Sequence, residues 1–451
     1  MLPKSPRLRR ILLAYTVNEL GTWFGYVALA LGVYDHTGSA IATAGLFVAR
    51  GLFPALLAPV LVARVERSAR DGRLAQLYVL EALLTVGLAA LLWHFWLPGV
   101  LVLVTLDGIV AVAATALVRA SAARVAVDDA IAQASRSAAS ASDVGGGRAS
   151  ATAVTAGRVE GPQLQAVTET AQRQASAALN FAFMGALAGG PALAGLLVHA
   201  LGGPAALLVD AATFAVCAGL LAWVRTHVEE SAGDSLGTRL LAAVSHLRLV
   251  PALWALFLTE AVALVFFSSV EPVEVVYAKS TLNAGALGYG LLLATWGLGA
   301  ALGAVVFARA VRRPLGPMLT GGTLLVGIAY LGFAVAPAIA VACAAAVVGG
   351  IGNGIQWPSL ISAVQQLTPA ALHGRLMSAV GSLNALCPAI GFALGGSVAA
   401  LASPRAAMAV AGGVATLATF AFLRLPIRGL QSGSDPSAVI AEEPDLVSVP
   451  R

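Results

Sequence analysis

Charged residues are scarce in this chain. They make up 11% of the 451 residues, whereas 59% are hydrophobic, against about 25% charged and roughly 45–50% apolar residues in an average soluble domain. The mean hydropathy is +0.86, and hydrophobic residues are spread over most of the chain, so the surrounding medium is lipid rather than water. The composition excludes a soluble fold and predicts an integral membrane protein.

Residues that build catalytic, metal or redox sites are also rare. The three cysteines, Cys217, Cys343 and Cys387, lie in apolar stretches without a Cys or His at ligand spacing, which argues against a disulfide framework and a zinc site. The six histidines are scattered, and the sequence contains no Gly-rich phosphate-binding loop. We therefore predict neither an enzyme nor an ATP-driven pump, and no cofactor and no metal.

Long apolar runs dominate the sequence. A helix needs about 20 apolar residues to cross a hydrocarbon core of about 30 Å, and the chain contains twelve such runs. The first is too long for a signal peptide and carries Asn18-Glu19 at its middle. The predicted fold class is all-α integral membrane with twelve transmembrane helices. The spans lie near residues 11–33, 41–63, 74–97, 98–118, 176–200, 204–224, 251–277, 284–308, 316–336, 338–364, 376–402 and 406–425.

Lysine and arginine are distributed unequally across the predicted membrane. Of the 27 such residues, Lys279 and Arg405 lie on the outer side and Arg50 lies inside a span, which leaves 24 on the side of both termini. The positive-inside rule therefore predicts that both termini lie in the cytoplasm. We expect a multi-pass protein of a bacterial-type cytoplasmic membrane. The net charge of +5 follows from this asymmetry, and we expect no nucleic-acid partner.

The two halves of the chain are related by a weak internal repeat. Residues 13–19 align with 253–259, and residues 190–195 align with 391–396 at an offset about 40 residues smaller. Such six-plus-six repeats are common in secondary transporters. They predict an N-terminal half at 1–224, a central cytoplasmic loop at 225–250, a C-terminal half at 251–425 and a tail at 426–451. The smaller offset indicates an insertion at about 126–170 in the first half, whose low hydrophobicity predicts a disordered or weakly helical cytoplasmic segment.

Several short segments carry a family resemblance. They are 18–23, 35–39 and 50–54 near the start of the chain, and 366–369 with 373–375 before the 376–402 span. Together they resemble the major facilitator superfamily, and within it the drug- and macrolide-efflux branch that also includes siderophore exporters. The resemblance implies two pseudo-symmetric halves with a substrate site between them.

Two motifs of that family are recognisable. The 176–200 span carries Gly189, Gly190, Pro191 and Gly195 in a run similar to the family's antiporter motif, which implies export; ordinary small-residue helix packing is the alternative. Residues 62–67 resemble a degraded Gly-x-x-x-Asp-Arg motif that ends in Glu66 and Arg67. These two residues either latch the halves on the cytoplasmic side or belong to a solvated loop.

Four charged residues lie near the middle of their predicted spans. At 1.5 Å per residue, Glu19 and Glu260 lie about 12 and 14 Å from the cytoplasmic ends, and Arg50 and Asp107 about 14 Å from the outer ends. Facing lipid would cost each roughly 2.5 to 3.5 kcal/mol, so we expect them to face the interior or a cavity. Three acids against one arginine favour proton uptake or a cationic ligand, and a structural Arg50 pair with Glu19 or Asp107 is the alternative. Other acids lie closer to helix ends, where we expect water or snorkelling to serve them: Glu81, Asp210, Glu271 and Glu274.

The 338–364 span combines glycines, two amides, an indole and a proline. Asn353, Gln356 and Trp357 precede Pro358, which suits a ligand-contacting hinge; a Pro-kinked packing helix is the alternative. The midplane charges and these residues favour a secondary transporter, and the family resemblance implies export. We therefore expect a proton-coupled, monomeric exporter of an amphipathic small molecule, such as a drug, macrolide or siderophore. The rival interpretations are a transport-dead scaffold or sensor with the same fold, and a lipid or uptake transporter.

Overall fold

The computed structural model describes residues 5–67, 72–144, 161–222, 224, 251–310, 313–368 and 373–423. These residues are helical almost throughout, and they contain no β-strand. Nine helical segments among them are long and apolar enough to cross a membrane. The protein is therefore a multi-pass membrane protein.

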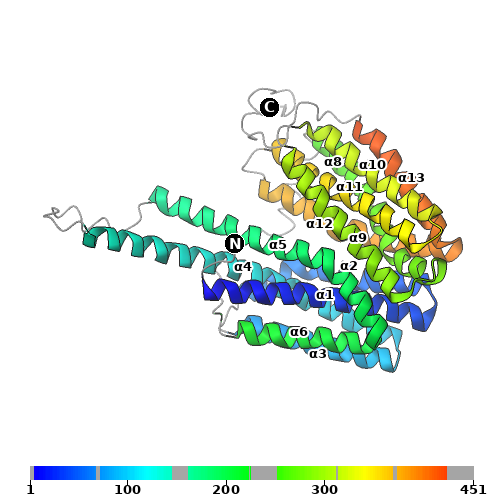
Figure 1. Ribbon diagram of the computed structural model, residues 1–451, viewed down its shortest axis with the longest axis horizontal. Coiled ribbons are helices and arrows are strands. Elements are labelled where there is room, and N and C mark those ends of the chain that lie inside the picture. Colours follow the sequence, from blue (N-terminus) through cyan, green and yellow to red (C-terminus); the bar gives the residue numbers. More distant parts are fainter. Residues whose placement is uncertain are drawn as a thin grey trace.

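The helices form two groups (Figure 1). We call the first group the N-terminal bundle and the second the C-terminal bundle. The N-terminal bundle consists of α1 (Pro6–Thr37), α2 (Ala40–Arg67), α3 (Arg73–Trp93), α4 (Leu97–Val144), α5 (Gly161–Leu201) and α6 (Gly203–Leu221). The C-terminal bundle consists of α8 (Pro251–Val276), the π-helix η2 (Tyr277–Thr281), α9 (Gly285–Arg309), α10 (Leu315–Val335), α11 (Ile339–Gln366), α12 (His373–Leu401) and α13 (Pro404–Leu423).

Local chemistry defines both ends of α1. The backbone N–H of Leu8 donates to the Ser5 Oγ atom at 3.3 Å, and Pro6 occupies the first turn, where a missing N–H costs nothing. The helix ends at Gly38, whose φ of 59° lies in the left-handed region that only glycine adopts freely. The chain can therefore turn within a few residues into α2.

The buried apolar residues of the described chain form three clusters at different positions along the helices. One core contains residues of both bundles, such as Leu29 of α1 and Tyr277 of η2. A second core belongs to the N-terminal bundle alone and includes Tyr15, and a third belongs to the C-terminal bundle alone and includes Leu253. The bundles are therefore joined where α1 ends and have separate cores where α1 begins, in agreement with their divergence toward that end in Figure 1.

The segment at 126–170 differs from the sequence expectation. Its first part, up to Val144, continues α4, and its last part, from Gly161, begins α5; the residues between lie outside the described part of the chain. Alanine has the highest helix propensity of all residues, so a segment too polar to enter lipid still extends the helices on either side. With 48 residues, α4 is about 72 Å long, more than twice the hydrocarbon thickness.

Candidate functional site

Two residues of the antiporter-like motif lie where α5 meets α9. A Cβ atom added to Gly195 would lie 2.7 Å from the Ala286 carbonyl oxygen and 2.9 Å from the Gly290 Cα atom. A Cβ atom on Gly290 would in turn clash with the Pro191 carbonyl oxygen. Small residues here allow backbone contact between helices. Pro191 and Gly195 thus help to join the two bundles.

The other two glycines of the motif lie elsewhere. A Cβ atom on Gly190 would lie 2.5 Å from the indole ring of Trp23 on α1, within the N-terminal bundle, and one on Gly189 would meet no atom within 4 Å. The alternative of ordinary helix packing therefore describes Gly190. The motif is divided between a contact inside one bundle and a contact between bundles.

A second contact of the same kind joins α12 to α2. A Cβ atom on Gly396 would lie 3.0 Å from the Ala40 carbonyl oxygen and would clash with the Ala44 side chain. Beside it, the rings of Phe47 and Phe392 are centred 5.5 Å apart. Gly195 and Gly396, which occupy aligned positions in the sequence, thus each contact the opposite bundle.

Glu19 belongs to a polar group with Tyr15 and Arg119. The Arg119 Nη2 atom donates a hydrogen bond to the Tyr15 hydroxyl at 2.9 Å, and its guanidinium carbon lies 5.7 Å from the centre of the Tyr15 ring. The half-buried Glu19 carboxyl group interacts with this hydroxyl and with the charge of Arg119. The cation that acts on Glu19 therefore comes from α4.

Arg50 lies beside an aromatic ring rather than in an ion pair. Its guanidinium carbon is 5.8 Å from the centre of the Tyr26 ring, and no ion pair within 4 Å in the described part of the chain includes Arg50. Asp107 is 7% exposed, its Oδ1 atom has no hydrogen-bond partner, and Arg50 is the charge that acts on it. The direct pair of Arg50 with Glu19 or Asp107 is thus absent from the described residues, and its link to Asp107 is electrostatic at longer range.

Two acids expected to reach water are instead buried. Glu81 is 1% exposed and Asp210 is 3% exposed, because α3 and α6 pack on each other and on α4 and α1. The Thr213 hydroxyl lies 3.4 Å from Asp210 Oδ1, whereas Glu81 Oε2 has no partner and lies within range of the charges of Asp107 and Asp210. The N-terminal bundle thus encloses three carboxyl groups. No group of three His, Cys, Asp or Glu residues in the described ranges is arranged to hold a metal ion.

Glu260 lies on α8 in the C-terminal bundle. The Gln356 Nε2 atom donates a hydrogen bond to Glu260 Oε2 at 3.2 Å, and both residues are buried. Trp357 and Asn384 line a small pocket beside the same carboxyl group. The half-buried Asn353 precedes Trp357 by one turn on α11 and does not line that pocket. The structure therefore brings Glu260, Gln356 and Trp357 together.

A further polar contact joins α1 to α8 where the bundles share a core. The Tyr26 hydroxyl donates to Glu271 Oε2 at 3.2 Å, and Glu274, one turn away, is 7% exposed. Nearer the end of α1, Lys279 forms a partly exposed ion pair with Asp35. Glu271 thus has a hydrogen-bond partner within the protein, and Glu274 is buried. The sequence predicted contact with water or snorkelling for both.

Aromatic rings continue from this contact into the C-terminal bundle. Phe267, one turn before Glu271 on α8, packs edge to face on Trp296 with ring centres 5.7 Å apart. Trp296 stacks on Tyr330 at 5.6 Å. Acidic and aromatic groups therefore lie together where the bundles meet, a combination that attracts cationic amphipathic molecules.

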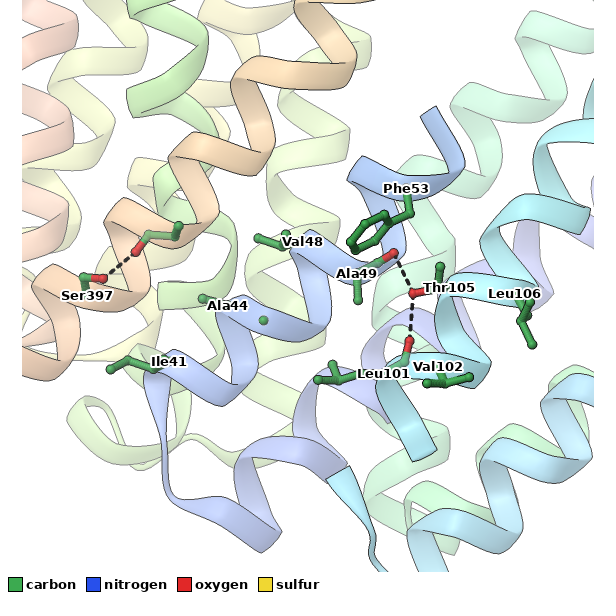
Figure 2. Close-up of a pocket in the computed structure, with 12 residues that line it drawn as sticks. Ile41, Ala44, Val48, Ala49, Phe53, Leu101, Val102, Thr105, Leu106 and Ser397 are labelled. Atoms are coloured by element: carbon green, nitrogen blue, oxygen red, sulfur yellow. Dashed lines mark hydrogen bonds between the residues drawn. The ribbon is translucent and has the colours of Figure 1, made fainter. Parts of the chain in front are cut away.

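A groove of about 570 Å³ opens between α2, α4 and α12 (Figure 2). On α2, its lining residues recur every three or four positions and so form one helix face. The only polar side chains in the lining are Thr105 and Ser397, and the dashed lines in Figure 2 mark their hydrogen bonds to backbone carbonyl oxygens. The groove is lined by Ile41, Ala44, Gly45, Val48, Ala49 and Phe53 of α2, Leu101, Val102, Thr105 and Leu106 of α4, and Ala393 and Ser397 of α12.

Some predicted site residues lie at the edge of the described chain. Glu66 and Arg67 are the last residues of α2, and the side chains at 58–71 lie outside the described part, as do those at 373–375. Arg119 directly follows the predicted 98–118 span, so the sequence does not place it among the charges within the membrane. A helix continued by one turn through the Ala-rich segment would have placed it beside α1. The Tyr26–Glu271 contact joins residues 245 positions apart, and neither side chain is distinctive in its own span.

The sequence matches one protein-family model. A sequence-family model described as "Transmembrane secretion effector" matches residues 150–449. No curated protein sequence gives a significant match.

Similar solved structures include the nucleoside transporter NupG, with a TM-score of 0.66, 10% identity, and coverage of 93% of this chain and 99% of that one. A POT family transporter in complex with a thioalcohol-conjugated peptide has a TM-score of 0.64, 13% identity, and coverage of 98% and 96%. A bacterial homologue of the iron transporter ferroportin, in an inward-facing state, has a TM-score of 0.62, 14% identity, and coverage of 94% and 99%. At these identities, the likeness concerns the fold.

Proposed function

Since the chain belongs to the transmembrane secretion effector family of the major facilitator superfamily, and is thus a membrane transporter of that type, we propose that it exports an amphipathic small molecule in exchange for protons. The observation that carries the proposal is a buried or half-buried carboxyl group in each bundle, Glu19 on α1 and Glu260 on α8. A scaffold does not require such groups, whose placement inside a membrane is unfavourable in free energy. The family description favours secretion as the direction.

The proposed architecture is a monomer with twelve spans in two six-helix halves, both termini being cytoplasmic. The two bundles correspond to these halves, and α1, α12 and α13 supply the spans that complete the set. The core shared by both bundles at one end, and the separate cores at the other, match a transporter that is closed to the outside and open to the cytoplasm. Separation of the bundles at the α5–α9 and α2–α12 contacts, together with closure at the other end, would expose the opposite side.

Glu19 and Glu260 have partners that suit proton exchange. The Glu19 carboxyl group faces Tyr15 and Arg119, and the Glu260 carboxyl group accepts a hydrogen bond from Gln356. A carboxyl group whose access to water and partners change between two states can take up a proton in one state and release it in the other. Asp107, with an unpartnered oxygen atom, is the third candidate for coupling, and Arg50 is the nearby cation.

The cargo is proposed to bind between the bundles. Glu271, Tyr26 and the rings of Phe267, Trp296 and Tyr330 supply acidic and aromatic groups there. Gln356 and Trp357 lie beside Glu260 in the C-terminal bundle. These groups favour a cationic or polar molecule with an apolar body. The structural neighbours carry nucleosides, peptides or metal ions according to their names, so the fold supports transport without selecting a cargo.

The test is accumulation of a panel of dyes, antibiotics and siderophores in cells with and without the protein, in the presence and absence of a protonophore. Export requires lower accumulation with the protein and loss of that difference when the protonophore is added. Glu19→Gln and Glu260→Gln should remain in the membrane yet lose gradient-driven export, and at least one should retain exchange of cargo without a gradient. The matched control is Glu169→Gln, which changes an exposed acid of α5 paired with Arg173.

Other outcomes would favour the rival functions. Unchanged accumulation of every compound, together with normal membrane expression, would favour a scaffold or sensor. Higher accumulation of one compound would indicate uptake, and movement of a labelled lipid would indicate a lipid transporter. Normal transport by both glutamine variants and by the double variant across about pH 5 to 8 would move the coupling site to Asp107.

A further inference from the structure

We infer that the groove between α2, α4 and α12 binds one acyl chain of a membrane phospholipid. This lipid site is separate from the proposed cargo site between the bundles. The inference needs only that the protein spans a membrane, so it stands even if the proposed transport function is wrong.

The position of the groove sets what can fill it. Its lining residues fall within two candidate membrane spans, Ala40–Leu57 and Leu97–Arg136, and within the apolar part of α12, Leu386–Leu401. Ile41 is 58% exposed, Phe53 is 50% exposed and Val102 is 60% exposed. Inside a bilayer, these side chains are covered by hydrocarbon because no water is present at that depth.

The length of the groove matches one lipid leaflet. Its lining residues on α2 extend from Ile41 to Phe53, about 18 Å at 1.5 Å per residue. Half of the hydrocarbon core is about 15 Å thick. The groove begins in the first turns of α2 and α4, at the membrane surface opposite the start of α1, so one chain of that leaflet can follow it to the middle of the bilayer.

The polar atoms of the groove exclude a headgroup as its occupant. The Thr105 hydroxyl donates to the carbonyl oxygens of Leu101 at 2.8 Å and Ala49 at 3.2 Å, and the Ser397 hydroxyl donates to that of Ala393 at 2.7 Å. These donors are therefore already used, and the lining contains no charged side chain. A phosphate or an amine in the groove would lose its hydrogen bonds to water and find no protein partner in exchange. An acyl chain has no such hydrogen bonds to lose.

The groove also continues an interface between the bundles. Ala44 lines it and at the same time contacts α12 at Gly396. Ala393 and Ser397 of α12 form its opposite wall. A chain in the groove thus touches both bundles, which distinguishes it from a lipid that lies on a single helix.

Gly45 provides a way to fill the groove. It lines the groove, and a Cβ atom added to it would meet no atom within 4 Å. A side chain at this position therefore enters the groove without displacing the backbone. Gly321 of α10 also has no atom within 4 Å of an added Cβ atom and does not line the groove, so it is the matched control.

The experiment places the purified full-length protein in nanodiscs that contain a phospholipid with a diazirine on one acyl chain. After illumination, mass spectrometry locates the cross-links. We expect adducts concentrated on groove residues of α2, α4 and α12, and in Gly45→Phe a decrease of about tenfold, the loss expected when two CH₂ groups are no longer buried. Gly321→Phe should leave the adducts unchanged. Gly45→Leu replaces the phenylalanine variant if that one does not fold.

Three results would overturn the inference. The first is an even spread of adducts over all lipid-facing helices, which would indicate ordinary surrounding lipid. The second is an equal number of groove adducts in Gly45→Phe and Gly321→Phe. The third is displacement of the lipid label by an exported compound, which would assign the groove to the cargo.

Discussion

Replacing Gly195 by alanine should favour separation of the bundles at the end where they share a core. Carbon atoms pack at about 3.5 Å or more, and a Cβ atom on Gly195 would lie 2.9 Å from the Gly290 Cα atom. The α5 and α9 backbones must therefore separate locally by about 0.6 Å. Overpacking of this kind costs about 1 to 3 kcal/mol, and the cost falls only on states in which the two helices touch. The equilibrium should shift by about 5- to 150-fold toward states in which they are apart.

The assay is alkylation of a cysteine introduced at Leu292, which is 1% exposed in the shared core. The background lacks the native Cys217, Cys343 and Cys387. The rate of alkylation should rise in Gly195→Ala by about 5- to 150-fold. The matched control is Gly189→Ala, in the same motif and helix, where the added methyl group meets no atom within 4 Å and alkylation should stay at the parent rate.

Equal labelling rates in Gly195→Ala and Gly189→Ala would refute this prediction. A lower melting temperature in Gly195→Ala with an unchanged labelling rate would refute it too, because the contact would then stabilise all states equally. Gly290→Ala gives an independent check, since its added methyl group would clash with the Pro191 carbonyl oxygen and should act in the same direction.

The remaining predictions concern charged groups. Arg50→Gln should lower stability by about 1 to 3 kcal/mol, because it leaves Asp107 buried without a nearby cation, and Asp107→Asn in that background should recover part of the loss in thermal unfolding; strictly additive effects would contradict the coupling. Gln356→Leu removes the hydrogen bond to Glu260 and should shift the pH dependence of export while protein expression is maintained; an unchanged pH profile would exclude Glu260 from coupling. Lys279→Gln should change stability by no more than about 1 kcal/mol, because its ion pair with the end of α1 is partly exposed; a larger loss on thermal unfolding would show that this pair helps to hold the bundles together.

The sequence was most informative where hydrophobicity alone decides the structure. The spans predicted at 284–308 and 316–336 correspond to α9, Gly285–Arg309, and α10, Leu315–Val335, because lipid requires long apolar helices. Hydrophobicity says little about a helix that leaves the membrane. The segment after residue 118 is too polar for lipid, yet it stays helical to Val144 because its alanines favour the helix in water as well.

The sequence singled out individual residues of the candidate site but not their arrangement. Depth in the membrane singled out Glu19 and Glu260, and amide chemistry singled out Gln356. The hydrogen bond between Glu260 and Gln356 joins residues 96 positions apart, and no local pattern encodes such a distance. Arg119 was missed for a simpler reason, since its role depends on α4 continuing past the apolar run.

The long helix α4 also amplifies rotation of the N-terminal bundle. The part from Arg119 to Val144 contains 26 residues of one continuous helix, about 39 Å at 1.5 Å per residue. If the N-terminal bundle tilts by about 10°, the far end of this segment moves by about 7 Å, although the helix within the membrane shifts much less. A fluorescent or spin label at the exposed Arg136 would therefore magnify a small rotation into a measurable displacement, and any molecule that binds this projection would exert torque on the bundle from outside the membrane.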